Sequence, residues 1–139
     1  MTQNDVATRL RALRSEMEKH HLDAWVLPSS DPHNSEYTPL RWKVRQFVSG
    51  FTASVSTMVV LKDAAYVWAD GRYWLQAEQE LAGTGIQIVY LGQPDVPPWN
   101  QWLAEKLPEG ARLGFYGATM MVKAVADVEE QLKSKRISV

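Results

Sequence analysis

The first part of the chain has the hydrophobic spacing of an amphipathic helix. Its apolar residues recur at intervals of four, three and four, at Val6, Leu10, Leu13 and Met17. This spacing places them on one face of a helix that would lie against a core. Asn4 or Asp5 is positioned to cap the start of this helix.

Short apolar runs alternate with helical patterns along the rest of the chain. Strands are predicted at 24–27, 57–61, 66–69, 86–91 and 112–116, and helices at 71–82, after residue 98 and around residues 121–132. The link 62–65 is short enough for a hairpin, so the second and third strands should be antiparallel. This order predicts one α/β domain over residues 1–139, with helices on both faces of a mixed sheet.

Residues with preferences for helix ends set the expected boundaries. Asp70 is predicted to cap the helix at 71–82. Asp95, followed by Pro97 and Pro98, indicates the next helix start, since a proline there removes no hydrogen bond. The buried face of that helix would contain Trp99, Trp102 and Leu103. The buried face of the last helix would contain Met121, Val125, Val128 and Leu132.

Composition and charge exclude several classes of function. The formal net charge is −1, so the chain lacks the positive field that binding to nucleic acid or to an anionic membrane requires. It has no Cys, which removes disulfides, thiolate nucleophiles and thiolate zinc sites. No apolar run approaches the ~20 residues of a membrane span, and the polar N-terminus does not resemble a signal peptide. A soluble, cytoplasmic protein is predicted.

Few residues are grouped as metal binding or catalysis would need. His20 and His21 are adjacent, so on a helix they point about 100° apart and should interact with the helix end. His33 lies near Asp31 and Glu36, and these three could hold a metal weakly or hydrogen-bond the backbone of their own loop. No serine stands in a nucleophile turn, and no glycine-rich phosphate loop is present.

The run Asp70, Gly71, Arg72 and Tyr73 has two interpretations. It follows a predicted strand and opens a predicted helix, where backbone N–H groups and the fork of Arg72 would favour a carboxylate ligand. Alternatively, Asp70 caps the helix and Arg72 pairs with Asp70 or Glu36. The pattern alone favours neither interpretation.

Four blocks resemble, in order and spacing, the N-terminal domain of Xaa-Pro aminopeptidases in the creatinase/prolidase family. They are residues 30–37 (SDPHNSEY), 45–52 (RQFVSGFT), 68–73 (WADGRY) and 76–81 (QAEQEL). The resemblance implies a three-layer α/β/α sandwich, ribonuclease H-like, with a mixed sheet of about five or six strands. It also implies a separate C-terminal domain of the pita-bread type that holds two metal ions, usually manganese. Residues 137–139 look like the start of a strand, which fits a piece of a longer chain.

The family pattern implies a substrate-facing role for a few residues. Arg72, with Tyr73 beside it, would reach toward the peptide substrate, and Asp31, His33 and Glu36, in the loop of the first block, are further candidate substrate-binding residues. No catalytic or metal-binding residue is expected in this chain, and by itself it should not hydrolyse peptides. The parent enzyme would release an N-terminal residue that precedes proline, and the domain would support a homodimer.

The sequence departs from the family pattern at two glycine positions, and two other functions stay open for the domain. In residues 50–57, where the second block continues, two glycines of the family pattern are replaced by Ala53 and Ser56, which would cost about 1 kcal/mol if either position needs a positive φ. The domain could instead belong to a non-enzymatic peptide-binding protein, as in a histone-chaperone subunit. It could also belong to a related hydrolase such as prolidase or creatinase.

Overall fold

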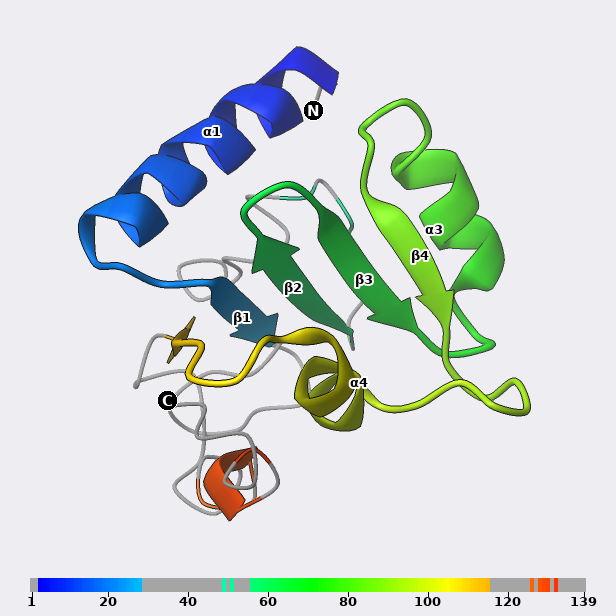
Figure 1. Ribbon diagram of the computed structural model, residues 1–139. Coiled ribbons are helices and arrows are strands. Elements are labelled where there is room, and N and C mark those ends of the chain that lie inside the picture. The colour runs from blue at the N-terminus through cyan, green and yellow to red at the C-terminus, as the bar shows by residue number, and fades with distance from the viewer. Residues whose placement is uncertain are drawn as a thin grey trace.

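The computed structural model describes residues 3–28, 49, 51, 56–115, 126, 128–130 and 132. Figure 1 shows the elements, which are in chain order α1 (Gln3–Lys19), β1 (Ala24–Pro28), β2 (Thr57–Leu61), β3 (Ala65–Ala69), α3 (Trp74–Glu80), β4 (Gln87–Tyr90), α4 (Trp99–Lys106) and β5 (Leu113–Phe115). The predicted strands are therefore confirmed, with ends that differ by one residue. No helix among these residues is long and apolar enough to cross a membrane.

The strands form one mixed sheet of five strands in the order β4-β3-β2-β1-β5. Strand β2 is antiparallel to β1 and to β3, whereas β4 is parallel to β3 and β5 is parallel to β1. Four strands therefore run in the same direction, and their C-terminal ends lie at one edge of the sheet. The register brings Pro28, Thr57 and Trp68 side by side at that edge.

Successive residues of each strand face two separate cores. On β2, Met58 and Val60 join a cluster with α1 and α3, whereas Val59 joins a cluster with α4. Val128 and Leu132, from the predicted last helix, also pack in the second cluster, while Met121 and Val125 lie outside the described residues. Helices thus cover both faces of the sheet, which confirms the three-layer α/β/α sandwich.

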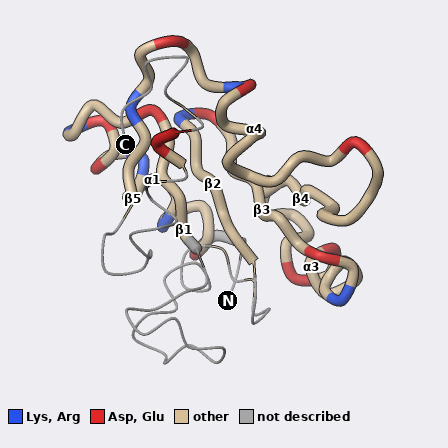
Figure 2. The backbone as a smooth tube through the Cα atoms, turned by 90° about the horizontal axis from the view of Figure 1, so that it is seen from below, with Lys and Arg blue, Asp and Glu red and all other residues tan. Residues whose placement is uncertain are grey.

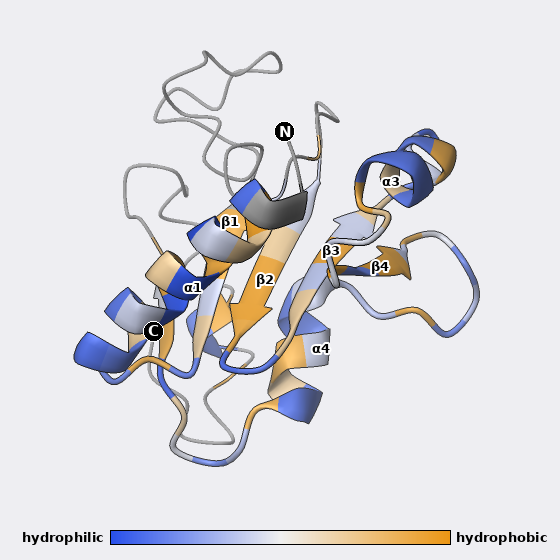
Figure 3. Cartoon of the chain, turned by 90° about the horizontal axis from the view of Figure 1, so that it is seen from above, coloured by the Kyte–Doolittle hydropathy of each residue, from blue (hydrophilic) through white to orange (hydrophobic). Residues whose placement is uncertain are grey.

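The charges of the domain lie outside the sheet. None of the five strands contains a charged residue, and Figure 2 shows the Lys, Arg, Asp and Glu positions of the described chain on helices and connections. In Figure 3 the central strand β2 is coloured as hydrophobic, whereas α1 alternates between hydrophilic and hydrophobic residues. This distribution is the one expected for strands that are buried on both faces.

Helix α1 buries the predicted face and ends in a Schellman motif. Val6, Leu10 and Met17 are each no more than 5% exposed. At its end the Leu22 N–H donates to the Met17 carbonyl at 2.8 Å, and the His21 N–H donates to the Glu18 carbonyl at 3.1 Å. These are the two hydrogen bonds of that motif, and His21 accordingly has a φ of 57°.

The predicted helix caps are wrong in three places. Asn4 and Asp5 lie inside α1, which is already helical at Gln3. Helix α3 begins at Trp74, because Asp70 closes a turn with Arg72 before the helix starts. Helix α4 begins at Trp99, preceded by Pro98 in extended conformation, and Asp95 adopts a positive φ of 66° well before it.

An aromatic cluster holds α4 against the sheet. The Trp68 indole N–H donates to the Pro97 carbonyl at 3.0 Å, just before the helix begins. The Trp102 ring lies 4.7 Å from the ring of Tyr66 and 5.2 Å from that of Trp68, measured between centroids. The predicted buried face of α4 is confirmed: Leu103 is fully buried, and Trp99 and Trp102 pack partly buried in the same cluster.

Of the two residues that replace family glycines, Ser56 lies among the described residues and Ala53 does not. Ser56 is 6% exposed and directly precedes β2. The residue before Ser56 lies outside the described part of the chain, so the cost of a positive φ at these two positions stays a prediction.

Candidate functional site

The chain leaves β3 through a tightly bonded turn at the C-terminal edge of the sheet. A carboxylate oxygen of Asp70 accepts a hydrogen bond from the Arg72 backbone N–H at 2.9 Å. The Asp70 carbonyl accepts the Tyr73 N–H at 2.9 Å. This is an Asx-type turn, in which a short acidic side chain takes the place of a backbone group. It fixes the backbone from which the Arg72 side chain projects.

The Arg72 guanidinium is held by two partners within this turn. Its Nε and Nη2 atoms donate to the two carboxylate oxygens of Asp70, at 3.2 and 2.9 Å. Its Cζ atom also lies 5.2 Å from the centre of the Tyr73 ring, in a cation–π contact. The Arg72 side chain is nevertheless 68% exposed, so an approaching ligand can reach it.

Arg72 also sets the charge state of the turn. Its hydrogen bonds and positive charge lower the pKa of Asp70 from the ordinary value of 3.8. At neutral pH the turn therefore contains a firmly ionised pair with no net charge. Of the two interpretations offered by the sequence, the pairing of Arg72 with Asp70 is confirmed, while helix capping by Asp70 is not.

Residues of helix α3 and strand β4 anchor the start of the turn. The Trp74 indole N–H donates to the Ala69 carbonyl at 2.8 Å, and the Trp74 ring meets the Tyr90 ring edge-on at 5.5 Å. The Tyr90 hydroxyl in turn donates to Glu78 at 2.9 Å, and this hydrogen bond raises the pKa of Tyr90. Trp74 was not among the sequence-predicted site residues, although an indole placed just after the Asp-Gly-Arg-Tyr run was a signal that it could anchor the turn.

The other predicted site residues fall outside the described part of the chain. Asp31, His33 and Glu36 belong to a segment that begins after Pro28, the last residue of β1. That segment starts at the same sheet edge as the Arg72 turn. One strand, β2, lies between β1 and β3, so the two strand ends are roughly 10 Å apart.

The described residues contain no metal centre. No group of three or more His, Asp or Glu side chains converges within them. His20 and His21 instead lie at the C-terminal end of α1, as their sequence position predicts, and His21 contributes to the Schellman motif. A pair of metal ions would therefore find no ligand set in the described part of this chain.

A family match decides how this fold and turn are classified. The model of the creatinase/prolidase N-terminal domain matches residues 9–139, nearly the whole chain. The chain belongs to this family. The creatinase/prolidase assignment agrees with the mixed sheet and the two helical layers.

Relatives of this creatinase/prolidase domain are much longer than the chain. The chain is 36% identical over 132 residues to a probable Xaa-Pro aminopeptidase P from Coprinopsis cinerea. This match covers 95% of the chain and 21% of the relative. The chain is 45% identical over 107 residues to aminopeptidase P1 from Lotus japonicus, covering 76% of the chain and 16% of that protein. The chain therefore spans about a fifth of the length of such relatives.

Solved structures of creatinase/prolidase proteins share the fold. The X-prolyl aminopeptidase from Caenorhabditis elegans, described as a cytosolic enzyme with a di-nuclear active site, superimposes with a TM-score of 0.86. Its sequence is 31% identical, and the match covers 100% of this chain and 24% of that one. The N-terminal domain of the peptidase PepQ from Mycobacterium tuberculosis is 24% identical, with a TM-score of 0.65 and coverage of 95% of this chain and 91% of that one, and supports the fold alone.

Proposed function

We propose that this domain is the N-terminal accessory domain of a cytosolic Xaa-Pro aminopeptidase. The parent enzyme releases the N-terminal residue that precedes a proline, and the domain borders the cleft through which the peptide enters. The observation that carries the proposal is the ordered turn at residues 70–73, which holds an exposed guanidinium at the sheet edge. The names of relatives at 36% and 45% identity supply the reaction class.

In this proposal the hydrolytic step takes place outside the domain. The two divalent ions, which we expect to be manganese, would be bound by the catalytic domain and would supply an activated water for peptide hydrolysis. The described residues of this chain hold no such ligand set. The chain's own contribution is recognition: Arg72 would offer charge-assisted hydrogen bonds to the carbonyl or carboxylate oxygens of the peptide.

The physical reason for placing substrate at this edge is the convergence of strand ends. Side chains that follow parallel strands gather at one edge of an α/β sheet, which is where such sheets usually bind ligands. The Arg72 turn follows β3, and the segment with Asp31, His33 and Glu36 follows β1. We propose that these residues and Tyr73 together line the peptide entrance, and that two copies of the enzyme associate as a homodimer.

The reaction class is tested with a matched pair of peptides. The enzyme that carries this domain is assayed on a tripeptide with proline at the second position and on the same peptide with alanine there. Release of the first residue should be efficient for the proline peptide alone. Equal kcat/KM for the two peptides would contradict the specificity that we propose. Activity on Xaa-Pro dipeptides alone would indicate a prolidase instead.

The accessory role is tested with the 139-residue chain by itself. We expect no release of the N-terminal residue, with or without added manganese, under conditions in which the whole enzyme is active. Turnover by this chain that follows its concentration through purification would contradict the accessory role.

A further inference from the structure

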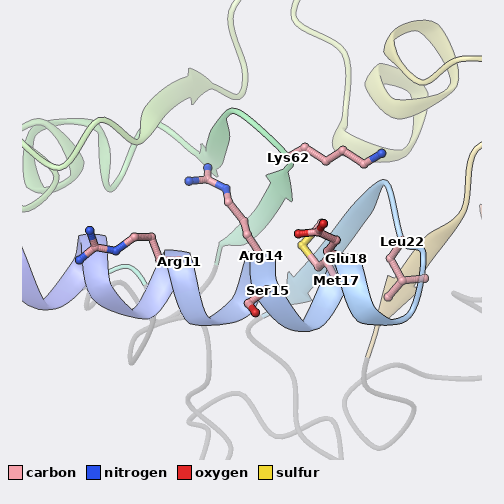
Figure 4. A pocket seen from close by; sticks show the side chains of 7 residues that line it. All are labelled: Arg11, Arg14, Ser15, Met17, Glu18, Leu22 and Lys62. Atoms are coloured by element: carbon pink, nitrogen blue, oxygen red, sulfur yellow. The ribbon is translucent and has the colours of Figure 1, made fainter.

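A second candidate binding site lies at the opposite edge of the sheet from the Arg72 turn. A pocket of about 520 Å³ opens between the C-terminal half of α1 and the β2–β3 hairpin, where its lining includes Arg14, Met17, Glu18, Leu22 and Lys62 (Figure 4). The distance between these two edges is the length of strand β3, roughly 13 Å. Nothing in the peptidase proposal uses this pocket.

Arg14 gives the pocket a positively charged wall. The side chain is half-buried, and its Nε–H donates to the Leu61 carbonyl at 3.0 Å, which fixes the plane of the guanidinium. Among the described residues, no Asp or Glu carboxylate pairs with Arg14, whereas Lys62, which also lines the pocket, pairs with Asp23. Arg11 is a further cation of the lining, but it is exposed, donates to the Thr8 hydroxyl at 3.4 Å and in Figure 4 extends away from Arg14. A guanidinium is always charged, and a partly buried charge favours an anion beside it. Arg14 is therefore a preformed docking point for a carboxylate.

The rest of the lining restricts which anion fits. Met17 and Leu22 are joined by the backbone hydrogen bond that ends α1. Leu22 is half-buried and supplies the accessible apolar surface of the pocket, while Met17 lines it from the core and is only 2% exposed. Glu18 adds one carboxylate, which would repel a second negative charge and would accept an N–H group. Lys62 binds Asp23 at 3.0 Å, and in Figure 4 its ammonium group extends away from Arg14. Arg14 is thus the cation best placed for a ligand.

We propose that this pocket binds the carboxyl end of a peptide whose last residue is apolar. The terminal carboxylate pairs with Arg14, the apolar side chain packs against Leu22 next to the nearly buried Met17, and the last amide N–H donates to Glu18. A phosphate dianion would be repelled by the carboxylate of Glu18. A carboxylate ligand without an apolar side chain would leave the apolar lining of the pocket uncovered. The volume falls within the usual range of small-ligand pockets and leaves room for more than one residue.

The probe for this site is N-acetyl-leucine, which has a carboxylate, an amide N–H and an apolar side chain. It is titrated into the 139-residue protein while NMR follows the Nε–H of Arg14 and the backbone amides of Met17 and Leu22. Saturable shifts of these three signals at millimolar probe are expected. N-acetyl-leucinamide, in which an uncharged carboxamide replaces the carboxylate, should bind at least about tenfold more weakly, as should acetate.

Two variants separate the role of Arg14 from general charge. Arg14→Gln should weaken N-acetyl-leucine at least about tenfold, whereas Lys106→Gln, which removes an exposed cation of α4, should leave the affinity unchanged. The comparison of acid with amide on the unaltered protein does not depend on how well the variant folds. Equal affinity for acid and amide, equal affinity for acetate, or no saturable binding of N-acetyl-leucine would each overturn the proposal.

Discussion

The pairing of Trp25 with Gly114 across β1 and β5 leads to a sharp prediction of stability. The two residues are opposite each other in the parallel register. A Cβ atom added at Gly114 would lie 2.5 and 2.6 Å from two carbons of the Trp25 ring and 2.7 Å from a methyl carbon of Leu22. All three distances are shorter than carbon–carbon contacts in folded proteins, so both side chains would have to move in Gly114→Ala.

The expected loss of stability follows from this geometry. Forcing extra volume into a packed site costs about 1–3 kcal/mol, while replacing glycine by alanine in a strand returns about 0.5–1 kcal/mol. The net effect of Gly114→Ala should be a loss of about 1–2 kcal/mol in the free energy of unfolding. For a domain of this size, that loss corresponds to a decrease in Tm of roughly 3–6 °C.

Urea unfolding followed by tryptophan fluorescence and circular dichroism measures this loss. Gly71→Ala is the matched control, because no atom of the described residues lies within 4 Å of the added Cβ and no left-handed φ is involved. Its stability should stay equal or rise slightly. In a Trp25→Ala background, part of the cost of Gly114→Ala should disappear. If Gly114→Ala were as stable as Gly71→Ala, the close approach of Trp25 would be refuted.

Three further predictions concern the helix end and the Arg72 turn. His21→Gly should stabilise the domain by about 0.5–1 kcal/mol in urea unfolding, because glycine adopts the positive φ of the Schellman motif without strain. Trp74→Phe should lose about 0.5–1.5 kcal/mol, since the Ala69 carbonyl loses its indole donor. The lowered pKa of Asp70 means that its pairing stabilises the fold above the ordinary pKa of 3.8 and ceases to do so as the pH falls through the folded-state pKa. Asp70→Asn should therefore be less stable than the unaltered protein at pH 7, by a small amount because the pair is exposed, and equally stable at the acid end of a pH series of unfolding curves. A variant that differs by the same amount at every pH would contradict this.

Hydrophobic periodicity was sufficient to predict the sheet and its two helical layers. Alternate residues of β2 and the spacing of Val6, Leu10 and Met17 report directly which face is buried. Helix ends were predicted less well, because they depend on local hydrogen bonds that several polar residues could make. The Asp70 carboxylate accepts the Arg72 backbone N–H in a turn and does not cap the helix that follows. His21 occupies a position where glycine is the usual residue.

The candidate site was only partly predictable for a related reason. The run at residues 70–73 carried enough chemistry to single out Arg72, and the structure shows its side chain exposed at the C-terminal edge of the sheet. Its support by Trp74 requires a contact between an indole and the carbonyl of Ala69, which a sequence pattern does not specify. The roles of Asp31, His33 and Glu36 remain predictions that concern the segment after β1.

The peptide-facing role that we propose for Arg72 is tested most directly by kinetics of the enzyme that carries this domain. The measurement is kcat/KM for a Xaa-Pro-Xaa peptide with Arg72→Ala, Arg72→Lys and, as a control for surface charge, Lys106→Gln. We predict that Arg72→Ala lowers kcat/KM by about tenfold or more, that Arg72→Lys recovers only part of it, and that Lys106→Gln changes nothing. An unchanged kcat/KM in a folded Arg72→Ala enzyme would remove this turn from the peptide entrance.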